Sequence, residues 1–258
     1  RTTAKIIAVG GEDVVLPSVV EAAEEIIEAQ GATVDFERLA GSDRWATAAA
    51  IAAKVGVRTE GTFKDTVFVV SGQNYPDALA ASPIAARNGV PILLSKQSEL
   101  PAQTAAALDD LGVKHVIMVG GVGVVGVAVE SAIEAAGHRV PGVGDNDNTS
   151  VDTRLQGSSR YDTSMRCSAY ALALGGFDDS DLFFATGRNW PDALGLASVA
   201  GQQRHPLVLL DGTELQNSSA VADYLRSRTA DTPGVTFVGG SGAIEDYVIG
   251  QVRIALGL

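Results

Sequence analysis

Residues 38–45 read RLAGSDRW, and the same pattern returns 116 residues later as RLQGSSRY at residues 154–161. A second pattern follows each copy, as SGQNYPDAL at residues 71–79 and TGRNWPDAL at residues 186–194. Ordered motifs that recur at one nearly fixed spacing indicate repeated structural units. The sequence therefore predicts at least two copies of one fold.

Two shorter motifs extend the repeat. PILL at 91–94 returns as PLVL at 206–209, and VGG occurs at 9–11, 119–121 and 238–240. The first copy of VGG precedes every other motif, so we expect only the final part of a repeat at the start of the chain. The expected organisation is the C-terminal part of a first repeat in 1–36, a second repeat in 37–141, a polar, turn-rich linker in 142–153 and a third repeat in 154–258.

Apolar residues within one repeat alternate between helical and extended patterns. Residues 44–55 and 76–87 have helical spacing, whereas residues 66–70 and 115–119 are short runs rich in β-branched and aromatic side chains. Short, continuously apolar strands that alternate with helices are typical of a parallel sheet covered on both faces. The predicted fold class is α/β, with tandem three-layer α/β/α sandwich repeats and mainly parallel sheets.

Composition narrows the classes of partner. The chain has 258 residues and a formal net charge of −12, which argues against a nucleic acid partner and restricts any polyanion to local clusters of cations. No stretch approaches the roughly 20 apolar residues of a membrane helix, so we expect no membrane insertion. The single cysteine, Cys167, lies in an apolar helical pattern and is expected to be buried.

The Arg-Leu-x-Gly-Ser-x-Arg block places two arginines six residues apart around a Gly-Ser turn. Arg38 and Arg154 are suited to tying one unit to its neighbour through carbonyls or carboxylates. Arg44 and Arg160 could do the same or could face a ligand. The residue pattern leaves both alternatives open.

The Asn-aromatic-Pro-Asp motif lies where a strand leads into a helix. Proline in the first turn and an aspartate near the helix dipole explain part of it without any ligand. The asparagine and the aromatic side chain are less well explained in that way, because they add an amphipathic face suited to polar or sugar-like ligands. The candidate ligand contacts in this motif are Asn74, Tyr75, Asp77, Asn189, Trp190 and Asp192.

One motif resembles a dinucleotide-binding loop. Residues 121–126 read GVGVVG after an expected strand, but residues 11–15 and 240–244 lack the same glycines in the other copies. A tight turn explains all three copies, so no nucleotide or other cofactor is expected. We find no metal-ligand spacing among the histidines, and the start of a calcium loop at 145–147 lacks the required glycine and glutamate.

Taken together, the segments RLAGSDRWATAAAIA, SGQNYPDALAASPIAARNGVPILLS and LGVKHVIMVGG closely resemble the cell wall binding repeat 2 family. The resemblance implies a secreted, non-catalytic module of S-layer-associated surface proteins in Gram-positive bacteria. Such modules occur in threes about a pseudo-threefold axis and attach other domains to anionic cell wall polymers. The family's polymer-binding motif matches Pro91, Ile92, Leu93 and Leu94, whereas the second copy departs from it at 207 and 208.

Two functions follow as hypotheses. The first is an extracellular anchor at the cell wall or cell surface, whose partner is a teichoic-acid-like polymer or an anionic polysaccharide. Self-association and a fused functional domain are further partners to expect. The net charge also calls for considering a neutral glycan or an arginine-lined cleft. The alternative is an α/β enzyme that acts on a nucleotide or sugar substrate at the carboxyl edge of the sheet.

Overall fold

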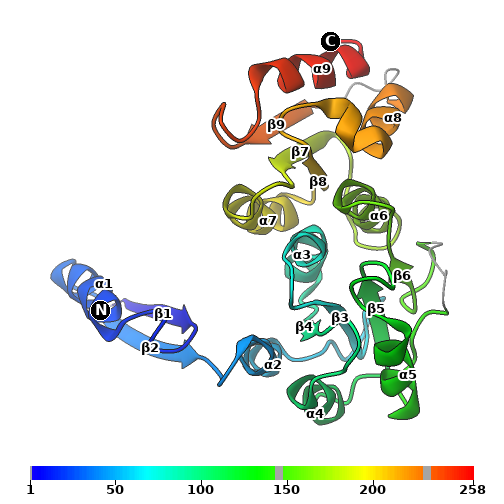
Figure 1. Cartoon of the computed structure of the whole chain (residues 1–258). Coiled ribbons are helices and arrows are strands. Elements are labelled where there is room, and N and C mark those ends of the chain that lie inside the picture. Colours follow the sequence, from blue (N-terminus) through cyan, green and yellow to red (C-terminus); the bar gives the residue numbers. More distant parts are fainter. Residues whose placement is uncertain (1, 143–147, 229–233) are drawn as a thin grey trace.

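The computed structural model describes residues 2–142, 148–228 and 234–258 (Figure 1). Strands and helices alternate along the chain, and the described strands form three separate sheets in which every ladder is parallel. This confirms the predicted α/β class. Among the described helices, none is both long enough and apolar enough to cross a membrane.

Sheet 1 contains two strands, β1 (Thr3–Val9) and β2 (Thr33–Leu39), joined by helix α1 (Pro17–Ala29). The strands pair in register from Thr3 opposite Thr33 to Val9 opposite Leu39. This βαβ unit stands apart from the rest of the molecule (Figure 1), and Val9 is 50% exposed on it.

Sheet 2 has the strand order β4-β3-β5-β6. Its strands are β3 (Thr66–Ser71), β4 (Ile92–Ser95), β5 (His115–Val119) and β6 (Arg154–Leu155). The short β6 pairs with β5, although the sequence repeat assigns its residues to the third unit. The last strand of sheet 2 therefore comes from the residues that begin the next sequence repeat. The same holds in sheet 1, where β2 ends with Arg38 and Leu39 of the second repeat. Residues 143–147 of the expected linker lie outside the described residues.

Helices cover both faces of sheet 2. One face packs against α2 (Arg44–Val55), α4 (Ala102–Asp110) and α5 (Val127–Ala135), and the other against α3 (Pro76–Asn88) and α6 (Arg160–Ala173). Successive residues of β3 point to opposite faces: Val67 enters the first layer and Phe68 the second, both fully buried. The predicted three-layer sandwich is confirmed for this sheet, and the helices begin close to the residues that the sequence periodicity predicts.

Sheet 3 repeats the arrangement in the order β8-β7-β9. Its strands are β7 (Asp181–Thr186), β8 (Leu207–Leu210) and β9 (Gly234–Val238). Helix α7 (Pro191–Gln203) covers one face, and a 3₁₀ turn η1 (Leu215–Ser218), α8 (Ser219–Ser227) and α9 (Asp246–Leu256) cover the other.

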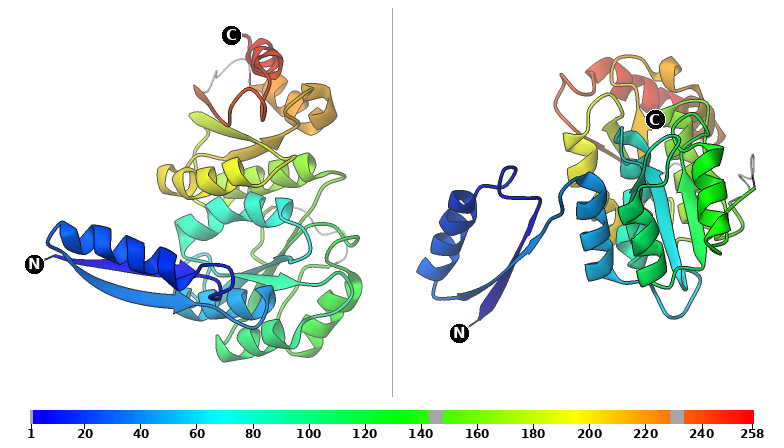
Figure 2. Two further views of the ribbon diagram at one scale, coloured as in Figure 1. Left: turned by 60° about the vertical axis from the view of Figure 1, so that its left-hand side comes forward. Right: turned by 60° about the horizontal axis from the view of Figure 1, so that its bottom comes forward.

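Sheets 2 and 3 share helices. Helix α6 places Cys167 and Tyr170 in the core of sheet 2, while its Met165 packs against the core of sheet 3. Helices α3 and α7 lie side by side (Figures 1 and 2), and a Cβ atom added to Gly201 of α7 would lie 2.7 Å from the Pro83 carbonyl of α3. The two sandwiches are therefore closely packed, and Cys167 is buried as the sequence predicts.

The first arginine of each repeated block ties strands together. Arg154 is fully buried and donates to the carbonyls of Gly120 at 2.9 Å and Val125 at 3.0 Å. Its other terminal nitrogen lies 2.8 Å from a carboxylate oxygen of Glu130. The half-buried Arg38 donates to the carbonyl of Gly10 at 2.8 Å, the same contact in sheet 1 without the glutamate. Arg38 and Arg154 thus make the structural contacts to carbonyls and a carboxylate for which the sequence pattern suits them.

Replacing Arg154 with alanine is predicted to lower the free energy of unfolding of the unit around sheet 2 by about 3 kcal/mol, because Glu130 would be left buried without a partner. Arg38→Ala, which removes a bond to a carbonyl only, is predicted to cost about 1 kcal/mol. Chemical denaturation of both variants measures the difference. Equal losses would contradict a special role for the buried ion pair.

Candidate functional site

The second arginine of each block begins a helix and is held at the carboxyl end of a strand. Arg44 starts α2, which Asp43 caps by accepting from the Ala46 amide at 2.8 Å. Its Nη1 atom donates to the carbonyl of Gly72, just after β3, at 2.7 Å. Arg160 makes the equivalent bond to the carbonyl of Gly187 at 2.6 Å. One side of each guanidinium is thus fixed by the fold.

Glycines in both motifs make this arrangement possible. A Cβ atom on Gly157 would collide with the Cβ atom of Asp162 in the next helix, and Gly41 meets Ala46 in the same way. A Cβ atom on Gly72 would lie 2.9 Å from the indole nitrogen of Trp45. The two repeated sequence motifs are therefore packed against each other in space.

An open groove lies between the carboxyl edge of sheet 2 and the start of α7, and we call it the inter-unit groove. Its volume is about 690 Å³. The lining residues are Arg44, Ser71, Gly72, Gln73, Asn74, Tyr75, Ala78, Leu94 and Trp190. Five of the residues predicted from sequence come together here, from three motifs and from two repeats.

Aromatic side chains and cations meet around this groove. Trp190 is 50% exposed, and the Tyr75 hydroxyl donates to the Arg188 carbonyl at 2.8 Å, which joins the starts of α3 and α7. The guanidinium of Arg160 lies 5.9 Å from the centre of the Tyr75 ring. Within the described part of the chain, Arg44, Arg160 and Arg188 have no carboxylate at ion-pair distance.

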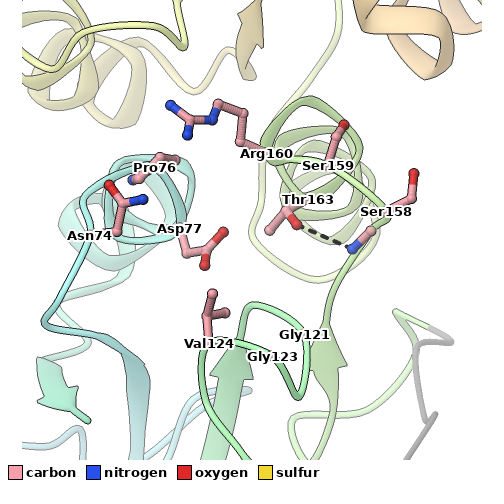
Figure 3. A pocket seen from close by; sticks show the side chains of 11 residues that line it. Asn74, Pro76, Asp77, Gly121, Gly123, Val124, Ser158, Ser159, Arg160 and Thr163 are labelled. Carbon is pink, nitrogen blue, oxygen red and sulfur yellow. Dashed lines mark hydrogen bonds between the residues drawn. The ribbon is translucent and has the colours of Figure 1, made fainter. Parts of the chain in front are cut away.

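A second, smaller pocket adjoins the groove through Asn74 and has a volume of about 320 Å³ (Figure 3). We call it the Asp77 pocket; its walls are the start of α3, the turn after β5 and the start of α6. Figure 3 shows Asp77 pointing from α3 toward Val124 of that turn, with Arg160 nearby. Burial raises the pKa of the Asp77 carboxyl above its ordinary value, and the charge of Arg160 partly offsets the rise.

A related pocket occurs at the end of sheet 1. Gly10 and Val14 of the first VGG turn face Gly41, Arg44 and Thr47, and the open pocket between them has a volume of about 510 Å³. A pocket therefore lies between the VGG turn and the Arg-Gly-Ser-Arg block at the ends of both sheet 1 and sheet 2. Residues 1–36 contain no counterpart of the Asn-aromatic-Pro-Asp motif that supplies the third wall of the Asp77 pocket.

The two copies of the Asn-aromatic-Pro-Asp motif differ in what their polar residues line. Asn74 and Asn189 each accept a hydrogen bond from the amide of the following aromatic residue at 2.9 Å, which is a turn-forming contact. Asp192 lies beside Gly239 in sheet 3, as Asp77 lies beside Gly120 in sheet 2. Asn189 and Asp192 line neither the inter-unit groove nor the Asp77 pocket.

Strand geometry separates the members of the Pro-Ile-Leu-Leu motif. Leu93 is fully buried against α2 and α4, whereas Ile92 and Leu94 point to the opposite face of sheet 2. Pro91 is buried just before β4. Only Leu94 of the four lines the inter-unit groove.

Arg188 lies near the site but is not among the residues predicted from sequence. Its guanidinium donates to the Thr213 hydroxyl at 3.3 Å, and its carbonyl holds Tyr75. The repeat itself carries the signal: the second copy of the motif reads Thr-Gly-Arg-Asn where the first reads Ser-Gly-Gln-Asn. A cation gained at a motif position is visible once the two copies are aligned.

Comparison with known proteins places this arrangement in a family. Residues 38–130 and 154–249 match cell wall binding domain 2 (CWB2). In Bacillus subtilis, N-acetylmuramoyl-L-alanine amidase LytC is 25% identical over 97% of this chain and 43% of its own length. The amidase enhancer of the same organism is 26% identical over 84% of this chain and 26% of its own length.

Two solved structures from Clostridium difficile are also similar. Cwp8 aligns with all of this chain and 39% of its own at a TM-score of 0.72, with 25% identity. Cwp6 aligns with 84% of this chain and 31% of its own at a TM-score of 0.65, also with 25% identity. The chain thus spans less than half the length of each of these relatives.

Replacing Arg160 with alanine is predicted to raise the pKa of Asp77 further, because the nearby positive charge that favours the carboxylate is removed. Because folding raises the pKa of Asp77, its protonated form stabilises the folded protein at pH values below the ordinary pKa of aspartate. This contribution to the free energy of unfolding is lost as the pH rises through the higher pKa of the folded state. Carbon NMR titration of the Asp77 carboxyl in both proteins measures the change. An unchanged or lower pKa in Arg160→Ala would contradict the assignment.

Proposed function

This chain belongs to the cell wall binding domain 2 family, and we propose that it is a non-catalytic module that anchors a surface protein to the cell wall. The ligand is an anionic polymer or glycan of the wall, and attachment is non-covalent. Its location is accordingly extracellular, at the cell wall or cell surface. Family membership and the similarity to Cwp6 and Cwp8 support this function.

We place polymer binding in the inter-unit groove. The observation that carries this proposal is a set of arginines at and beside the groove that have no ion-pair partner among the described residues, although the whole chain has a net charge of −12. Arg44 lines the groove itself, Arg160 lines the adjoining Asp77 pocket 5.9 Å from the centre of the Tyr75 ring, and the carbonyl of Arg188 accepts a hydrogen bond from the Tyr75 hydroxyl. A strongly negative protein attracts a polyanion only where cations are concentrated. Arginine also offers paired donors that match the oxygens of phosphate and carboxylate groups.

The aromatic residues favour a polymer that contains sugars. Trp190 and Tyr75 present large amphipathic surfaces at the two sides of the inter-unit groove, and Leu94 adds an apolar contact from β4. Rings of this kind pack against the apolar face of a sugar while amide and guanidinium groups bind its hydroxyls and charged substituents. A teichoic-acid-like polymer or an anionic polysaccharide combines both features.

The chemistry of the lining supports binding over covalent catalysis. Guanidinium, amide, phenol, indole and aliphatic groups form most of the inter-unit groove, and they hold a ligand through hydrogen bonds and packing. The one serine in the lining, Ser71, is buried, and its hydroxyl accepts from the Gln73 amide at 3.2 Å. The activity of a longer protein of this kind would reside in the sequence that the module attaches to the wall. Purified chain incubated with cell walls is expected to sediment with them and to release no soluble fragments.

Replacing both Arg44 and Arg160 with alanine is predicted to weaken wall binding by roughly 2 to 4 kcal/mol, since two charge-assisted contacts are lost. The salt dependence of binding is expected to become less steep. Binding to purified walls and to walls stripped of anionic polymer, measured over a range of salt concentrations, provides the test.

Two controls are needed, one for the change in net charge and one for stability, because both arginines also bond to backbone carbonyls. Arg226→Ala with Arg253→Ala changes the net charge equally on helices α8 and α9, away from the inter-unit groove, and should leave affinity nearly unchanged. Trp190→Ala should weaken binding without a change in melting temperature, because the side chain is half exposed. Loss of binding only in proportion to unfolded protein would contradict the proposed site.

A further inference from the structure

The VGG turn occurs three times and is completed by a neighbouring strand in two of them. In sheet 1 the Gly10 amide donates to the Leu39 carbonyl at 2.9 Å, and the Gly10 carbonyl accepts from Arg38. In sheet 2 the Gly120 amide donates to the Leu155 carbonyl at 2.9 Å, and the Gly120 carbonyl accepts from Arg154. The same Arg-Leu pair thus satisfies both backbone groups of the glycine.

The third turn has the same conformation. Gly10, Gly120 and Gly239 all have positive φ, at 113°, 105° and 126°. The Ile244 amide donates to the Gly240 carbonyl at 3.0 Å, as the Val125 amide donates to the Gly121 carbonyl at 3.0 Å. Sheet 3 is therefore shaped at this point like the two sheets that hold an Arg-Leu strand.

In sheet 3, however, the position beside the turn is open. Strand β9 pairs with β7 on one side, and no described strand pairs with its other side. The amide and the carbonyl of Gly239 have no hydrogen-bond partner among the described residues. Residues 235–238 of β9 are only half-buried, whereas the matching residues 116–119 of β5 are fully buried. Unpaired backbone groups at a sheet edge favour the addition of another strand.

We propose that the open edge of β9 is a binding site for an extended segment carrying an Arg-Leu pair, supplied by a repeat outside residues 1–258. The segment adds in parallel, with its arginine opposite Phe237 and its leucine opposite Val238, as Arg154 and Leu155 lie opposite Met118 and Val119. Its arginine donates to the Gly239 carbonyl, and its leucine carbonyl accepts from the Gly239 amide. The Asp192 carboxylate lies beside Gly239, 2.8 Å from where a Cβ atom on this glycine would sit, and its charge favours an incoming cation.

This contact joins one repeat to another and is separate from polymer binding. The same arrangement occurs twice in the chain, in sheets 1 and 2, where the edge strand of the sheet contains the Arg-Leu pair that begins the next repeat. Binding is expected to cover the exposed edge and to give sheet 3 the four-strand order of sheet 2.

The test uses the whole chain and a fluorescent peptide with the sequence of residues 150–160, SVDTRLQGSSR. Fluorescence polarisation is expected to show saturable binding with one peptide per chain. The matched peptide with alanine in place of the Arg154 equivalent is expected to bind at least about tenfold more weakly, because a charged donor to the Gly239 carbonyl is lost.

Hydrogen exchange locates the contact. Amides in residues 234–240 should exchange more slowly with peptide bound, whereas those in residues 4–10 should not change, because β2 already covers that edge of β1. Equal binding of the two peptides, absence of binding at millimolar concentration, or protection elsewhere would overturn the proposal. Sedimentation showing a dimer whose residues 234–240 are protected without peptide would also overturn it, since a second copy would then be the occupant.

Discussion

The buried guanidinium of Arg154 is the contact on which the arrangement of the two complete sandwiches depends. It joins a strand that the sequence repeat assigns to the third unit to the turn and helix that end sheet 2, through Gly120, Val125 and Glu130. A fully buried charge is tolerated only when its partners are in place. Strand β6 is therefore fixed, and α6, which begins five residues after β6 ends, is fixed with it.

The inter-unit groove follows from this constraint. Because α6 packs on sheet 2 as well as sheet 3, and α3 packs on α7, the starts of α3 and α7 are brought together. Tyr75 and Trp190 then line one open space with Arg44 and Leu94. A single repeat could not form this surface, which gives a physical reason for the tandem arrangement of the units.

The helices and most strands could be predicted from sequence, because the periodicity of apolar residues is a local property. The two copies of the repeat also support the same assignment of elements. Helix α2 and strand β5 have the predicted bounds. The pairing of β6 with β5 could not be predicted, since two residues carry no periodic signal and their partner lies across the linker. The candidate site was identified in part: Arg44, Tyr75 and Trp190 converge, whereas Leu93 faces the opposite layer because strand side chains alternate.

The most direct test of the central claim, that polymer occupies the inter-unit groove between two interlocked repeats, is the accessibility of Trp190. The chain has two tryptophans, so a Trp45→Phe protein reports Trp190 fluorescence alone. With purified wall polymer at saturating concentration, acrylamide quenching of Trp190, which is 50% exposed in the free protein, is predicted to fall severalfold. Tight polymer binding with unchanged quenching would contradict the account, because the polymer would then lie elsewhere on the module.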